Sequence, residues 1–79
     1  MNTFYTLNIY TENIVGLLSR ITAVFTRRHI NIESLTVSET EKKGISRFTV
    51  VINVTEDMVI KVTKQINKII EVILTEYHE

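Results

Sequence analysis

The segment Thr11–Gly16 contains residue types that could bind a small ligand. It is a polar turn that ends in one of the chain's two glycines and leads into a predicted helix. The first free N–H groups of a helix point beyond its N-terminus and favour a carboxylate, and a glycine lets a ligand approach the backbone. Asn13 could bond the turn itself or a ligand's polar end. On spacing alone an ordinary turn is the simpler interpretation, because Asn and Gly are common turn residues.

Asn31 is the second candidate for a ligand contact. It lies on the outward phase of a strand predicted over 30–38, although asparagine has poor strand propensity. An exposed edge residue is again the simpler interpretation. The two candidates support each other as parts of one ligand site. Pairing of this strand with its copy in a dimer would bring Asn31 of one subunit toward the turn of the other.

Other kinds of chemistry find little support in the residue types. The chain has no cysteine, which excludes disulfides and thiolate metal sites. Ser19 and His29 are ten residues apart on or near one predicted helix, beyond the hydrogen-bond reach that a Ser/His/Asp site needs. No plausible helix face carries two metal ligands at i, i+4, and Gly16 lacks dinucleotide or P-loop spacing. We therefore expect no catalytic residue, metal site or cofactor.

The composition indicates one small domain that spans residues 1–79. Hydrophobic residues make up 44% of the chain, but a domain this small is marginal alone and often needs oligomerisation. Nine basic and nine acidic residues cancel, so no global field favours nucleic acid or an anionic membrane. The N-terminus does not resemble a signal peptide. We expect a soluble, cytoplasmic protein.

The hydrophobic pattern predicts the element order β-α-β-β-α-β. Alternation predicts strands over 3–10, 30–38, 46–54 and 71–77, and helical spacing predicts one helix from Leu17 and another after an N-cap at Thr55. The alternation slips at Ser34, which predicts a bulge near Glu33–Ser34. Residues 39–44 are expected to form a hairpin loop. The first helix is expected to bury Leu17, Leu18, Ile21, Val24 and Phe25.

This order is best satisfied by an α+β, ferredoxin-like βαββαβ fold, a four-stranded antiparallel sheet with both helices on one face. The spatial strand order is then 4-1-3-2, so the second and fourth strands are edges. Glu71, Glu76 and Glu79 on or near the last strand oppose edge pairing. The second strand is therefore expected to form the seam of an isologous dimer.

RNA binding is the main alternative, because the RNA recognition motif has the same element order. That module needs outward aromatic residues for base stacking. Phe48 shares its face with Val50 and Ile52, and Tyr5 is likewise in phase with core residues. A ligand-free module that only docks on a partner is the other alternative.

Three stretches resemble the N-terminal ACT domain of the small regulatory subunit of acetolactate synthase (acetohydroxyacid synthase). Residues 12–20 read ENIVGLLSR, like the family's E-N-x-x-G-x-L-S-R, and residues 31–37 read NIESLTV, like N-I-E-S-L-x-V. Ser46-Arg47 before an apolar strand resembles S-R-[MF]-T. The stretches occur in the family's order and spacing, so their combination is more specific than any single glycine.

The resemblance implies an ACT fold, side-by-side dimers, and a branched-chain amino acid, usually valine, bound at the dimer interface. By match, Asn13, Val15, Gly16 and Leu17 belong to the turn that contacts this effector, and Asn31 with Ile32 comes from the partner chain. Backbone N–H groups near Gly16 and Leu17 would receive the carboxylate. The Leu17 side chain would contact the aliphatic part.

In that family the effector sets feedback inhibition of a separate catalytic large subunit in valine, leucine and isoleucine biosynthesis. The catalytic subunit holds thiamine diphosphate, magnesium and flavin, and the regulatory subunit also raises its activity. The resemblance thus implies a regulatory chain that is not an enzyme. Two departures are visible. Many members continue into a second domain, whereas this sequence ends at Glu79, and Val15 stands where relatives often have a small polar residue.

Overall fold

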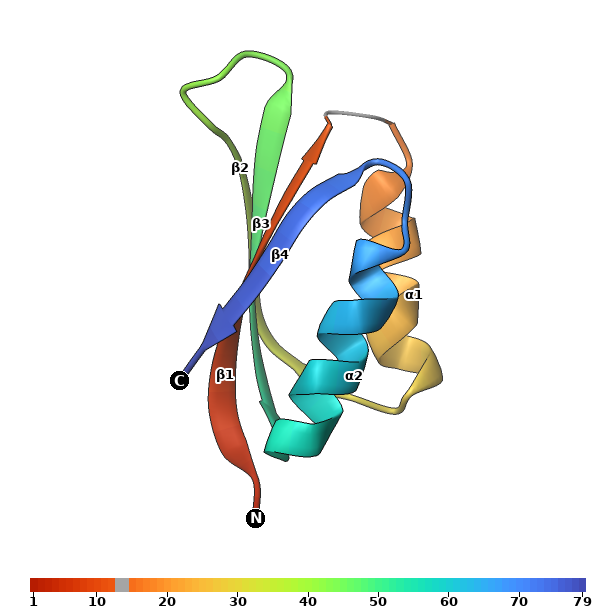
Figure 1. Cartoon of the computed structure of the whole chain (residues 1–79), viewed down its shortest axis with the longest axis vertical. Coiled ribbons are helices and arrows are strands. Elements are labelled where there is room, and N and C mark those ends of the chain that lie inside the picture. Colours follow the sequence, from red (N-terminus) through yellow and green to blue (C-terminus); the bar gives the residue numbers. More distant parts are fainter. Residues whose placement is uncertain (13–14) are drawn as a thin grey trace.

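The computed structural model describes residues 1–12 and 15–79, and its elements follow the predicted order (Figure 1). The strands are β1 (Thr3–Glu12), β2 (Ile32–Glu39), β3 (Ile45–Val54) and β4 (Val72–His78), and the helices are α1 (Leu17–Arg27) and α2 (Glu56–Asn67). All strand pairs are antiparallel, in the order β2-β3-β1-β4. Both helices lie on the same face of the sheet. The predicted ferredoxin-like fold is confirmed, with β2 and β4 as its edges.

The core lies between the sheet and the two helices because each central strand is apolar on one face only. β1 buries Tyr5, Leu7 and Ile9 on that face, and β3 buries Phe48, Val50, Ile52 and Val54. The helices supply Leu17, Ile21, Val24, Phe25, Val59, Val62 and Ile66. Leu18 was expected in this core but is 44% exposed, since it projects beyond the side of α1 that the sheet covers.

The predicted bulge in β2 is confirmed. Ile32 pairs with Ile52 and Ser34 pairs with Val51, so Glu33 has no partner residue on β3. This insertion changes the phase of the strand, and Leu35 now faces the same side of the sheet as Ile32. All residues of β2 after Ile32 are exposed, which shows that the helices do not cover this strand fully.

The ends of the helices are defined by local hydrogen bonds. The Thr55 hydroxyl accepts from the Met58 N–H at 3.2 Å, as predicted for an N-cap. After α1 the chain turns through His29, whose φ of 57° is left-handed, and the Ile30 N–H donates to the Phe25 carbonyl at 2.9 Å. None of the described helices is long and apolar enough to cross a membrane.

Polar side chains tie the layers at both ends of the helices. Arg28 Nε donates to Gln65 Oε1 at 2.7 Å and so joins α1 to α2. Arg20 forms an ion pair of 2.8 Å with Glu71, which lies between α2 and β4. On the helix-covered face of the sheet, Tyr5 of β1 contacts Tyr77 of β4 edge-on. Burial raises the pKa of the Tyr5 phenol above its ordinary value.

The N-cap of α2 provides a test of this local structure. We expect Thr55→Ala to lower the free energy of unfolding by ~1 kcal/mol, because the N–H group of Met58 loses its acceptor. Thr55→Ser keeps the hydroxyl and should stay close to the parent chain. Urea denaturation of the three proteins measures both differences, and equal losses in the two variants would contradict a capping role.

Candidate functional site

The N-terminus of α1 is open toward solvent. Its N-cap is Gly16, which has a left-handed φ of 87°, and no described side chain accepts a hydrogen bond from the first turn. That turn also contains no acidic residue. The first N–H groups of α1 and the positive end of its dipole are thus available to an anion.

A hollow of about 160 Å³ lies beside this helix start. Its lining combines the end of β1, the first turn of α1 and neighbouring residues of β2 and β3: Thr11, Glu12, Gly16, Leu17, Leu18, Val37, Ser46 and Phe48. Thr11 is completely buried, and its hydroxyl has no hydrogen-bond partner in the part of the chain that the structure describes. Leaving a buried hydroxyl unpaired is unfavourable. A polar ligand group in the hollow could remove that penalty.

The residues predicted for the turn occupy different environments. Asn13 lies outside the described residues. Val15 and Gly16 are exposed, whereas Leu17 is only 2% exposed and belongs to the core. The leucine of the first turn that offers apolar surface to solvent is therefore Leu18, although Leu17 also lines the hollow.

Asn31 and Ile32 lie at the other end of α1. Asn31 is exposed, directly precedes β2 and donates a hydrogen bond of 2.7 Å to the Glu33 carboxylate. It borders a separate hollow near Arg28 and Thr55. Ile32 is half-buried and packs against the core. Within one chain the structure therefore does not bring Asn31 to Gly16.

The edge strand β2 connects these two places. Val37, near its end, lines the hollow at Gly16, and Asn31 stands before its first residue. Antiparallel pairing of β2 with a second copy would set the start of one β2 beside the end of the other. Such pairing would carry the partner's Asn31 toward the hollow.

Six residues that line the hollow were not among the predicted contacts, namely Thr11, Glu12, Leu18, Val37, Ser46 and Phe48. Thr11 continues the buried odd positions of β1, which extends to Glu12 rather than ending at Tyr10. The sequence could have indicated Thr11, because its hydroxyl group stands at a position of β1 where the alternation otherwise places apolar side chains. Val37 is distant in sequence, and only the register of β2 on β3 places it there.

The face of the sheet that the helices leave uncovered is where an RNA recognition motif would stack bases. Phe48 and Tyr5 are buried under the helices, as predicted. On the open face, β1 presents two aromatic residues, Phe4, which is 58% exposed, and Tyr10, which is half-buried. The neighbouring β3 presents Arg47, Thr49, Val51 and Asn53 there, with no aromatic ring for a base to stack on.

Comparisons with known proteins agree with this architecture. The family model "AHAS small subunit-like ACT domain" matches residues 7–74. The acetolactate synthase small subunit of Mycobacterium avium is 46% identical over 69 residues, which are 87% of this chain and 41% of the relative. That of Bacillus subtilis is 48% identical over 85% of this chain and 40% of the relative. The chain thus spans about two fifths of these relatives' length.

A solved structure is also similar over almost the whole chain. The crystal structure of the acetolactate synthase small subunit from Thermotoga maritima superposes with a TM-score of 0.87 and 27% sequence identity. The match covers 95% of this chain and 47% of that one.

The two glycines allow a matched test of the backbone at the helix start. Gly16 and Gly44 have φ values of 87° and 86°, and a Cβ at either would meet no atom within 4 Å. We expect Gly16→Ala and Gly44→Ala each to lower the free energy of unfolding by ~1–2 kcal/mol, because alanine disfavours the left-handed region. Thermal and urea unfolding measure the losses. An unchanged stability of Gly16→Ala would contradict the left-handed N-cap.

Proposed function

Since the chain belongs to the family of AHAS small subunit-like ACT domains, we propose that it is a regulatory module that binds a branched-chain amino acid, with valine as the first candidate. The observation that carries this proposal is the open helix start at Gly16. It combines N–H donors and a buried Thr11 hydroxyl that have no side-chain partner among residues 1–12 and 15–79, beside one hollow.

The hollow has the chemistry that a small zwitterion requires. The N–H groups at the start of α1 would receive the carboxylate. The apolar part would lie against Leu18 and Val37, which are 44% and 47% exposed. Asn13 would hold a polar end from the same chain.

We propose that the site is completed in a dimer through β2, with Asn31 and Ile32 supplied by the second copy. Leu35 and Val37 on the helix side of β2 remain 38% and 47% exposed. Pairing would remove them from water and satisfy the free edge. β4 also exposes Ile73 and Leu74, but Glu76 lies within that strand and Glu79 just beyond it. The glutamates of β2, Glu33 and Glu39, lie instead at the bulge and at the last residue of the strand, outside the stretch 34–38.

The module would act on a separate catalytic large subunit of acetolactate synthase in the cytoplasm. It would carry feedback inhibition in valine, leucine and isoleucine biosynthesis and raise the activity of that subunit. The thiamine diphosphate chemistry belongs to the catalytic subunit in this proposal. A ligand held between two protomers stabilises one geometry of their interface over others. A partner that binds the two geometries with different affinities would respond to this change.

The proposed seam predicts which edge controls dimerisation. Val37→Lys should weaken the dimer at least tenfold, because a charge would be buried in the seam, while the half-exposed position spares the monomer. Leu74→Lys is the matched control, since Leu74 is 50% exposed on the opposite edge. Sedimentation equilibrium measures both constants. A dimer that is lost only in Leu74→Lys, or a monomeric parent chain at micromolar concentration, would contradict the β2 seam.

Ligand binding is tested by calorimetric titration with valine, leucine and isoleucine. A ligand at ~100 times its Kd should raise the free energy of unfolding by ~2.7 kcal/mol. Asn31→Ala should weaken binding about tenfold, which corresponds to the ~1.4 kcal/mol of one hydrogen bond, and should leave the fold intact.

Glu33→Ala is the control for this variant, because it removes only the acceptor of the Asn31 side chain within the chain. It should bind the amino acid nearly as well as the parent. Equal affinities of Asn31→Ala and the parent would remove Asn31 from the site. The absence of binding by all three amino acids would favour a ligand-free assembly module.

A further inference from the structure

The charge of the molecule is strongly divided between its two layers. The helical layer, defined as residues 17–29 and 56–68, contains six of the nine basic residues and only two of the nine acidic ones. Its net charge is therefore +4, and the strands and loops carry −4. α1 has no acidic residue at all, and in α2 both lie in the first turn, where Asp57 already pairs with Lys61 at 3.0 Å.

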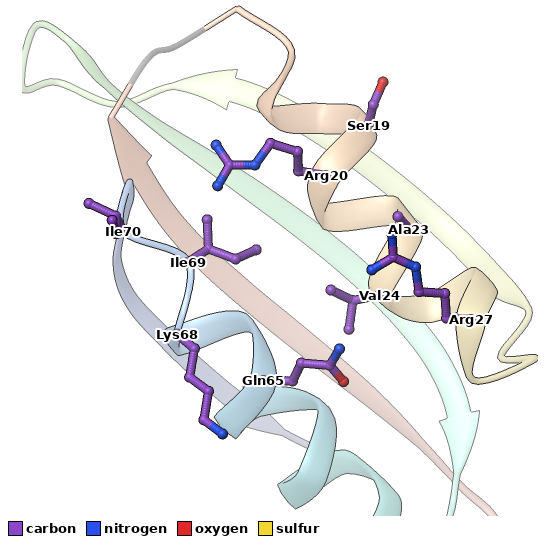
Figure 2. Close-up of a pocket in the computed structure, with 9 residues that line it drawn as sticks. All are labelled: Ser19, Arg20, Ala23, Val24, Arg27, Gln65, Lys68, Ile69 and Ile70. Atoms are coloured by element: carbon purple, nitrogen blue, oxygen red, sulfur yellow. The ribbon is translucent and has the colours of Figure 1, made fainter.

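An open groove of about 620 Å³ runs between α1 and the end of α2 in this positive layer. Figure 2 shows Arg20 and Arg27 projecting from α1 with Ala23 between them, while Gln65, Lys68 and Ile69 lie on the opposite side. The small Ala23 leaves space between two turns that each carry an arginine. The groove is therefore apolar along its middle and cationic along both sides.

Two polar contacts hold the groove in shape. The Arg20–Glu71 ion pair joins α1 to the turn before β4, and the hydrogen bond from Arg28 to Gln65 joins the two helices. Arg27 and Lys68 are exposed, and neither side chain has a hydrogen-bond or ion-pair partner in residues 1–12 or 15–79. These two cations are free to meet an outside anion. Ile70 at the same groove is 93% exposed.

We propose that this groove is the docking surface for an acidic segment of the catalytic subunit, whose side chains alternate carboxylates with apolar residues. The carboxylates would pair with Arg27 and Lys68, and the apolar side chains would cover Ala23, Ile69 and Ile70. A polyanion without apolar groups would leave Ile70 exposed to water, so the groove favours a polypeptide over a nucleic acid. The proposal rests on the proposed function for the identity of this partner.

The docking surface also leaves the effector site free. The groove involves the sides of the helices, whereas the effector hollow lies at the start of α1 beside β2. Partner and amino acid could therefore bind the same dimer at once, which regulation through a bound module requires.

The test measures the affinity of the full chain for the acetolactate synthase catalytic subunit of the same organism by calorimetry, in about 0.1 M and 0.5 M salt. Arg27→Glu/Lys68→Glu should weaken binding at least tenfold in low salt, and the difference should shrink in high salt, because salt screens these exposed charges. Ile70→Ser should weaken binding severalfold at both salt concentrations. Lys42→Glu/Lys43→Glu changes the net charge equally at the exposed hairpin and should bind within about twofold of the parent.

Thermal unfolding and valine titration of each variant separate this proposal from the preceding one. Loss of catalytic-subunit binding in the groove variant, with normal unfolding, supports the docking surface even if no amino acid binds. The proposal is overturned if the groove variant binds the catalytic subunit as the parent does, or if the hairpin control loses binding equally. It is also overturned if the parent does not bind the subunit, or binds heparin or polyuridylate through the groove in its place.

Discussion

The apolar layer between the sheet and the two helices determines where the other features lie. The buried apolar side chains of the sheet come from β1 and β3, and β2 contributes none. Covering the central strands therefore leaves β2 as an exposed edge, with the start of α1 next to Val37. The hollow, the open helix end and the free strand edge all follow from two helices covering a sheet of four strands.

Much of this arrangement could be predicted from the sequence because each central strand has only one covered face. That asymmetry produces the alternation of β1 and β3, and the change of phase at Ser34 revealed the bulge in β2. The exposure of Leu18 could not be predicted, because the sequence does not say how far around α1 the sheet covers the helix. Thr11 was assigned to the polar turn and not to β1, because its hydroxyl interrupts the apolar pattern of the strand. The hollow could not be predicted because Val37 reaches it only through strand pairing.

The small size of the domain gives the proposed dimer a thermodynamic role. A domain of this length buries a modest fraction of its surface, so contacts between copies in the proposed dimer would contribute substantially to its stability. If an effector binds across the seam, its binding and the association of the subunits are linked with equal strength in both directions. Effector binding and dimerisation would then use the same interface, while the helical layer would remain available for other contacts.

The unpaired Glu33 has a consequence for how the chain tolerates changes of length. Side chains alternate along a regular strand, so removing this single extra residue would join Ile32 to Ser34 in their present register and would keep Leu35 and Val37 on the helix side of the sheet. Removing the residue between Leu35 and Val37 would instead turn one of these two side chains to the opposite face of the sheet, away from the apolar edge beside the hollow. Insertions at the hairpin near Gly44 carry no such penalty. Variation in length among functional chains of this kind should therefore accumulate at the hairpin and at the bulge, and be absent from residues 35–37 of β2.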